Sequence, residues 1–509
     1  MQSPKHDEEI QRAGGYEQGH LNRFKSRLSC RFIVWWSIAW GIGVMALSPI
    51  VNYLTPFLNP SYASQWTPDI YWRLVMYWHG GIFIPWITTL AALCCMAFKL
   101  DKMGGRSGKL ITDSVLIGGI FAVPIAGIAG IFDIFDNYAM GVPLWTQIFA
   151  FLIGDEMAIA LIIAMLNQPR VSGHGYLRAG LPFYVVLVGI CSALVSAMMG
   201  HVGGWITWFG PNPSLVSQYI SGQMTPALGF YNSTSIITFT ENVVTSHSHL
   251  MLPALMAGVI GLVAAFYGYD KWSANEKLIA GFGFLVMIGA LFATNWIYVV
   301  SGVGNYATPT LFVSGPAGAN GIAADDVITG IVGIGGFFVL LALLMESRRG
   351  TTHEGVKLLK DPLFLSIIVS WITIYLVIPV TGYYIEMNEF FYQAGGMGFD
   401  DAFNRFHQDF GFFLLPALVS AALALGAFQI SGKTRKIVGY LFMSGVAMAF
   451  VFGEIYAMFT LNPVALYLAA LGGIMIGIGL FEGVLYLARR PKAAPTIVQT
   501  KKELTQQIA

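Results

Sequence analysis

The chain has 509 residues, of which 56% are hydrophobic and only 11% are charged. Because soluble globular domains carry about 25% charged residues, this composition excludes an ordinary soluble protein and predicts repeated membrane crossings. The formal net charge of +1 gives no indication of nucleic-acid binding, so we expect membrane lipid, and not nucleic acid, as a partner.

Twelve apolar segments follow one another along the chain, each long enough to cross a hydrocarbon core of about 30 Å. They cover residues 32–52, 72–98, 113–133, 144–166, 180–203, 243–268, 277–301, 327–345, 363–385, 405–430, 437–460 and 464–488. We therefore predict an all-α integral membrane domain over residues 31–490, with about twelve transmembrane helices. Residues 1–30 and 491–509 form an N-terminal segment and a C-terminal tail.

The basic residues alternate between the two sides of this predicted bundle. If the N-terminus is cytoplasmic, the cytoplasmic segments hold 26 of the 28 Lys and Arg residues, as the positive-inside rule requires. The outer loops carry acidic residues instead. Only Arg73 and Arg405 break the pattern, and each lies at the outer end of a predicted helix, close to a histidine. We expect both termini in the cytoplasm of a prokaryotic plasma membrane.

Five of the nine histidines share a predicted layer in the outer third of the membrane. They are His79, His201, His247, His249 and His407. Histidines recur on the second, sixth and tenth segments, at steps of 168 and 160 residues, and a proline follows each time. This repeat predicts three pseudo-symmetric four-helix units. One histidine near the interface is commonly structural, but a recurring layer of them favours metal or heme binding.

His247 and His249 are two residues apart, and the spacing predicts how they bind. At 3.6 residues per turn, their side chains leave a helix about 200° apart. They cannot hold one metal together, but they can hold two metals on opposite faces of the helix. Deeper in the membrane, Asp155 and Glu156 indicate either a proton path or structural hydrogen bonds.

Three stretches resemble subunit I of the heme-copper oxidase superfamily, which includes the nitric oxide reductases. They are PDIYWRLVMYWHGG (68–81), VVTSHSHLMLPALMAGVIGLVAAFYGY (243–269) and RFHQDFGFFLLPALVS (405–420). The resemblance implies that His79 and His249 bind a low-spin heme and that His247 binds a second, high-spin heme. It also implies a metal site at His407, holding copper or non-heme iron.

Further groups complete the site that this resemblance implies. His201 is a second candidate ligand beside His407, with Asp409, Glu241 or Glu454 as the candidate catalytic acid. Carboxylate oxygen suits iron better than copper(I). Arg73 and Arg405 are candidate partners of the heme propionates, because a guanidinium binds a carboxylate in bidentate fashion.

We therefore expect a respiratory oxidoreductase subunit. It would pass electrons from a cytochrome or quinol donor, through a bis-histidine heme, to a centre that reduces O₂ or NO. The resemblance implies a second subunit carrying cytochrome c or copper. The family's paired histidines on its seventh helix have no counterpart here, which leaves open a heme-only relative that transfers electrons or senses a gas. A twelve-helix secondary transporter without heme is the other alternative.

Overall fold

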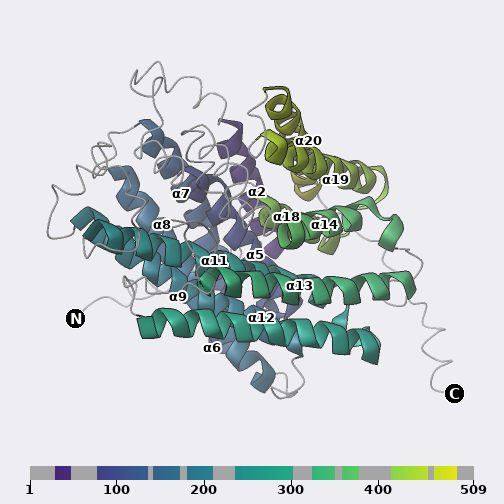
Figure 1. Cartoon of the computed structure of the whole chain (residues 1–509), viewed down its shortest axis with the longest axis horizontal. Helices are drawn as coiled ribbons and strands as arrows, with labels where there is room; N and C mark the ends of the chain where they lie inside the picture. Colours follow the sequence, from purple (N-terminus) through teal and green to yellow (C-terminus); the bar gives the residue numbers. More distant parts are fainter. Residues whose placement is uncertain are drawn as a thin grey trace, which may run out of the picture.

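The computed structural model describes residues 29–47, 77–135, 142–171, 180–209, 236–301, 324–349, 358–377, 414–456 and 463–489. Helices joined by turns make up this described part of the chain, which contains no β-strand (Figure 1). The prediction of an all-α protein is confirmed for these residues. They exclude the predicted C-terminal tail, and the N-terminal segment except for residues 29 and 30.

The helices match the predicted apolar segments in order, and their bounds show where each one begins and ends. They are α2 (Cys30–Ala46), α5 (Ile84–Ala97), α6 (Gly105–Leu110), α7 (Gly118–Phe135), α8 (Val142–Val171), α9 (Leu181–Phe209), α11 (Ile236–Phe266), α12 (Ala274–Ser301), α13 (Ala324–Arg349), α14 (Pro362–Ile372), α18 (Leu415–Ala427), α19 (Gly432–Ile455) and α20 (Pro463–Ala488). Three π-helices extend this set, namely η2 (His79–Phe83) before α5, η4 (Ile111–Ile117) before α7 and η8 (Thr373–Val377) after α14.

Eight described helices are long and apolar enough to cross a membrane. Four more, within α2, α11, α14–η8 and α18, are apolar but shorter over their described residues. Large apolar side chains are exposed along α7, α8, α12 and α20, where a soluble protein would carry charge. The chain is therefore an integral membrane protein that contacts lipid.

The contacts between helices repeat along the chain in successive groups of four. The groups are α2, α5, α7 and α8; then α9, α11, α12 and α13; then α14, α18, α19 and α20. In every group the first helix packs against the second and third, and the fourth packs against the same two. The fourth helix of each group also contacts the first helix of the next, and α20 closes the ring against α2.

The second helix of each group lies toward the middle of this arrangement. Helices α5, α11 and α18 contact one another in all three combinations. A buried hydrogen bond joins two of them, because the indole Nε1 of Trp86 on α5 donates to Ser420 Oγ on α18 at 3.0 Å. Of the three recurring histidine positions, His247 lies on α11 and His79 on η2 directly before α5, while His407 lies outside the described residues.

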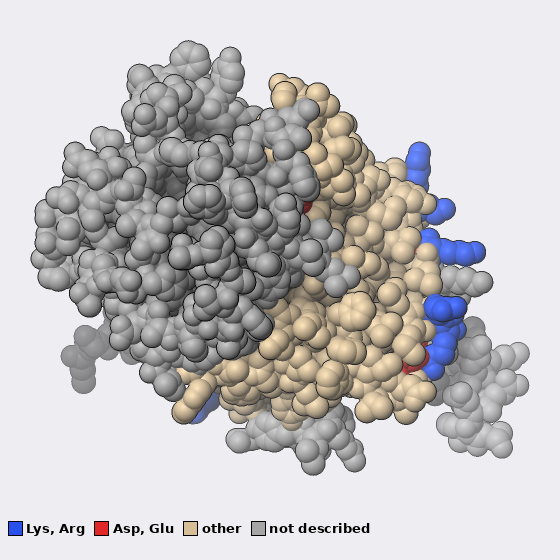
Figure 2. Space-filling view, in the orientation of Figure 1, with Lys and Arg blue, Asp and Glu red and all other residues tan. Residues whose placement is uncertain are grey.

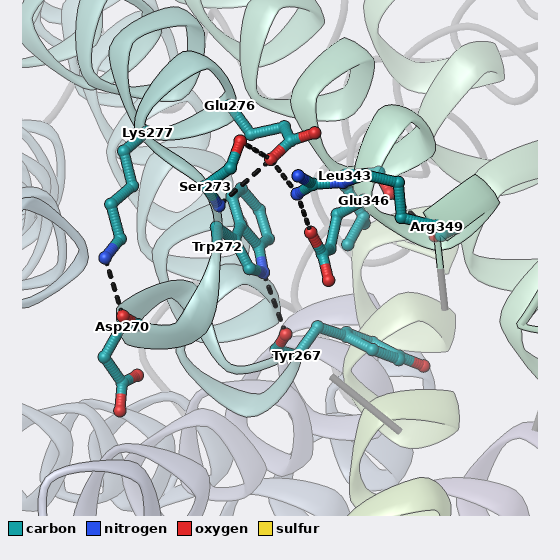
Figure 3. Close-up of polar contacts among 10 residues, drawn as sticks. Tyr267, Asp270, Trp272, Ser273, Glu276, Lys277, Leu343, Glu346 and Arg349 are labelled. Atoms are coloured by element: carbon teal, nitrogen blue, oxygen red, sulfur yellow. Dashed lines mark hydrogen bonds and ion pairs between the residues drawn. The ribbon is translucent and has the colours of Figure 1, made fainter. Parts of the chain in front are cut away.

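A charged cluster joins the start of α12 to the end of α13 (Figure 3). Ser273, just before α12, pairs with Glu276 in the first turn: its backbone N–H donates to Glu276 Oε2 at 3.0 Å, and its hydroxyl donates to the same oxygen. Arg349 donates to both Glu276 and Glu346, whose side chains are buried. One guanidinium therefore serves two carboxylates and links the two helices.

A second ion pair of the same kind joins α14 to α19. Asp361 caps the N-terminus of α14 and accepts two hydrogen bonds from Arg435, at 2.9 and 2.5 Å. Figure 2 shows Lys and Arg gathered along the edge where α13 ends and α19 begins in Figure 1. The ion pairs of Arg349 and Arg435 therefore lie along this basic edge.

Candidate functional site

The structure describes four of the ten predicted site residues in full. These are His79 at the start of η2, His201 on α9, His247 on α11 and Glu454 on α19. Glu241 and His249 lie on α11, but their side chains are outside the described part of the chain. Four others lie outside the described residues altogether, namely Arg73, Arg405, His407 and Asp409.

His247 lies deep within its helix and faces α9. Helix α11 begins at Ile236, so about 16 Å of helix precedes the histidine, where the sequence predicted only a few residues. Its Nδ1 lies 2.7 Å from the backbone carbonyl oxygen of Ser196. A carbonyl oxygen only accepts, so this contact assigns the proton to Nδ1 and leaves the lone pair on Nε2.

Ser196 and Gly200 shape the surface on which this imidazole lies. The hydroxyl of Ser196 donates to the backbone carbonyl of His247 at 2.6 Å, which joins α9 to α11 beside the ring. One turn later, a Cβ atom added to Gly200 would lie only 2.9 Å from Cε1 and Nδ1 of the ring. The ring therefore packs directly against the α9 backbone. Sequence reasoning missed both residues, although their four-residue spacing places them on one face of α9.

His201 and Asp155 form a hydrogen-bonded pair between α9 and α8. The distance from His201 Nε2 to Asp155 Oδ2 is 2.6 Å, and both side chains are mostly buried. The sequence predicted His201 as a metal ligand and placed Asp155 deeper, but the contact puts the two at the same level. Because the Asp155 carboxylate is hydrogen-bonded to Nε2, only Nδ1 of this imidazole remains available to bind a metal ion.

His79 begins the π-helix η2, and two glycines set its position. A Cβ at Gly80 would lie 2.2 Å from the carbonyl oxygen of Ala126 on α7. A Cβ at Gly81 would lie 2.9 Å from a Val44 methyl carbon on α2. Because both residues lack a Cβ, η2 approaches α2 and α7 closely. π-Helical turns of this kind occur frequently at functional sites.

The imidazole of His79 lies among aromatic rings. The ring centroid of Phe83 on η2 is 5.4 Å from that of His79, and the centroid of Phe151 on α8 is 5.7 Å away. His79 is therefore directed toward α8, the helix that also carries Asp155.

Three histidines and one acid form a polar cluster inside the bundle. His79, His201 and Asp155 all lie close enough to His247 to act on it electrostatically. They come from η2, α8, α9 and α11, so the structure brings together three of the five histidines that the sequence placed in one layer. In the described part of the chain, no three His, Cys, Asp or Glu side chains converge as ligands of one metal ion.

Glu454 lies apart from the elements that carry this cluster. It is on α19, which packs chiefly against α14 and α20. The residue is 7% exposed, and among the described residues neither carboxylate oxygen has a hydrogen-bond partner. Its prediction as a catalytic acid beside the histidines is untested.

Comparisons with protein-family models, curated proteins and solved structures give no match to this chain. Function must therefore be inferred from the geometry of the polar cluster.

Proposed function

We propose that the protein is a membrane-bound heme oxidoreductase subunit in which Nε2 of His247 would bind a heme iron. The observation that carries this proposal is the Nδ1–H bond to the Ser196 carbonyl. Metal-bound histidines almost always donate their other ring N–H to a carbonyl or carboxylate, which fixes the tautomer and orients the ring. His247 already has this arrangement.

The described histidines fit heme, which needs few ligands from the protein. A porphyrin supplies the equatorial nitrogens, so the protein provides only one or two axial imidazoles. His79, His201 and His247 each come from a different element, and each has its own surroundings. The spacing of His247 and His249 in the sequence supports a second heme, low-spin and bound by His249 and His79.

Heme would supply reversible one-electron chemistry, and the chain would supply orientation and proton handling. The hydrogen bond between Asp155 and His201 can hold a proton beside His247. Electrons would come from a cytochrome or quinol donor, through a second subunit that carries cytochrome c or copper. We propose O₂ or NO as the substrate, reduced at a centre completed by His407 and Asp409, Glu241 or Glu454.

A heme-only relative is the second candidate function, and one observation favours it. No predicted span carries the paired histidines of the family's seventh helix, so two of the family's copper ligands have no counterpart in this chain. In this alternative the hemes transfer electrons or bind a gas, and no separate metal is present.

We also propose twelve spans in three pseudo-symmetric units. The repeated contacts within each group of four helices, and the mutual contacts of α5, α11 and α18, support this arrangement. The basic residues at the ends of α13 and α19 support placing that side in the cytoplasm.

The direct test is a set of histidine variants of the full-length protein, expressed with heme supplied. His247→Ala should remove one heme and its high-spin signal, while His79→Ala should remove the low-spin signal. His174→Ala, in a segment expected to be cytoplasmic, is the matched control and should leave the spectrum unchanged. A wild-type protein without a Soret band would favour the transporter alternative. An unchanged spectrum in His247→Ala would refute this ligand.

A further inference from the structure

Glu156 occupies an unusual position on α8. It is the eleventh residue of the 23-residue apolar segment Thr146–Gln168, so about 15 Å of helix separates it from the nearer end. Its side chain is exposed, unlike that of its neighbour Asp155, which faces the histidine cluster. An acidic side chain therefore lies near the middle of a membrane span, on the side of the helix that faces away from the bundle.

The residues around Glu156 show that this surface faces out of the bundle. Phe149, Leu152, Ile159 and Ile163 follow the same helical face and are 56%, 50%, 46% and 41% exposed. Their spacing of three and four residues makes one continuous stripe with Glu156 at its centre. On the adjacent helix α7, three large apolar side chains are also exposed, namely Phe121, Ile128 and Phe132. We call this the α7–α8 face.

Hydrocarbon tails do not satisfy a carboxyl group at this depth. Ser114 Oγ donates one hydrogen bond to Glu156 Oε1, at 2.9 Å. Within the described part of the chain this is the one partner of Glu156, although a carboxylate accepts several hydrogen bonds. Ionisable groups in membrane spans are costly when exposed to lipid, and they normally face protein or water. No second group that hydrogen-bonds to Glu156 therefore lies on the α7–α8 face among the residues that the structure describes.

We propose that a transmembrane helix of a different protein covers the α7–α8 face and places a hydrogen-bond donor or basic side chain opposite Glu156. A second copy of this chain fits less well. Apart from Glu156, the exposed stripe on α8 and the exposed side chains of α7 are apolar, so a symmetric copy would offer a second carboxylate and no donor. Like charges opposite each other repel. This proposal does not depend on heme.

The test uses the full-length protein in the membranes of its own cell. A photo-crosslinking amino acid, p-benzoylphenylalanine, replaces Leu152 or Ile159, which flank Glu156. The matched control replaces Ile474 on α20, an exposed apolar residue outside this face. We expect positions 152 and 159 to crosslink one other protein. The crosslinked peptide should be a transmembrane segment with a hydrogen-bond donor or basic side chain within one helical turn of the crosslinked residue. Position 474 should not crosslink that protein.

A second variant tests the role of the carboxylate itself. Glu156→Leu should lower the crosslinking yield by about fivefold, because interhelical hydrogen bonds in membranes contribute modestly. Glu156→Gln retains an acceptor and should keep most of the yield. Thermal unfolding of both variants in detergent verifies that they fold. Crosslinks to lipid alone, to a second copy of this chain, or with a yield unchanged in Glu156→Leu would overturn the proposal.

Discussion

At the scale of single residues, the polar groups of this bundle differ in whether their hydrogen bonds are satisfied. His247 has its Nδ1 paired with Ser196, and His201 has Nε2 paired with Asp155. Glu454 is as deeply buried as Asp155 but has no partner among the described residues. Replacing the unpaired carboxylate of Glu454 and the paired carboxylate of Asp155 by leucine should therefore change the stability of the protein in opposite directions.

Gly200→Ala tests whether the ring of His247 needs direct contact with α9. The new Cβ would lie 2.9 Å from two ring atoms, so we expect overpacking to cost about 1–3 kcal/mol in stability. In the heme-bound protein the displaced ring should also shift the high-spin signal. Gly258→Ala on α11 is the control, because nothing lies within 4 Å of a Cβ added there. Equal melting temperatures for the two variants would contradict this packing.

Glu454→Leu should stabilise the protein in detergent. The substitution removes a buried polar group without breaking a hydrogen bond in the described structure, and such groups cost about 1–3 kcal/mol. Asp155→Leu is the contrasting variant, since it leaves His201 without its partner and should lower the melting temperature. If Glu454→Leu also lowers the melting temperature, a partner outside the described residues binds this carboxylate.

At the scale of helices, short polar clusters at the helix ends link neighbouring helices. Glu276 accepts from Ser273 at the start of α12 and also from Arg349 of α13, and Asp361 caps α14 and also accepts from Arg435 of α19. Inside the bundle, helices pack through apolar side chains and close approaches at glycine, such as Gly80 against α7. The ionic contacts therefore add specificity to packing that is otherwise apolar.

Arg349→Leu should lower the free energy of unfolding by about 3 kcal/mol. This is the lower end of the range for breaking a buried ion pair, because the Arg349 side chain is 40% exposed while Glu346 is fully buried. The neighbouring Arg348 is also exposed and has no ion pair in the described structure, so Arg348→Leu is the matched control. Thermal unfolding in detergent compares the two. A loss in Arg348→Leu as large as that in Arg349→Leu would contradict the account.

At the scale of the whole molecule, hydropathy predicted the helices well but did not predict the contacts between them. Each predicted apolar segment contains a described helix, because length and apolarity alone decide where a chain can cross a membrane. The bonds of His247 to Ser196 and of His201 to Asp155 join residues 51 and 46 positions apart. They depend on how each helix is rotated about its axis. The π-helix at His79 depends on close packing at Gly80, which hydropathy does not record.

The proposed twelve-span topology makes a prediction for three described positions at or between helix ends. Cysteines placed at Lys102, Asp270 and Lys433 should react with a membrane-impermeant thiol reagent only from the cytoplasmic side. Native cysteines give little background, because Cys30, Cys94 and Cys95 are buried, and Cys191→Ala removes the fourth. Labelling of one position from the opposite side would contradict the topology.

The most direct test of the central proposal is a redox difference spectrum of the purified full-length protein, with heme and metal counts per chain. We predict a Soret band that shifts on reduction, with two hemes per chain, one low-spin and one high-spin. Copper or non-heme iron found at a stoichiometric level beside the hemes would favour the oxidase or reductase. Hemes without another metal would favour the heme-only relative. A protein expressed with heme supplied that shows no Soret band would contradict the proposal that His247 binds heme.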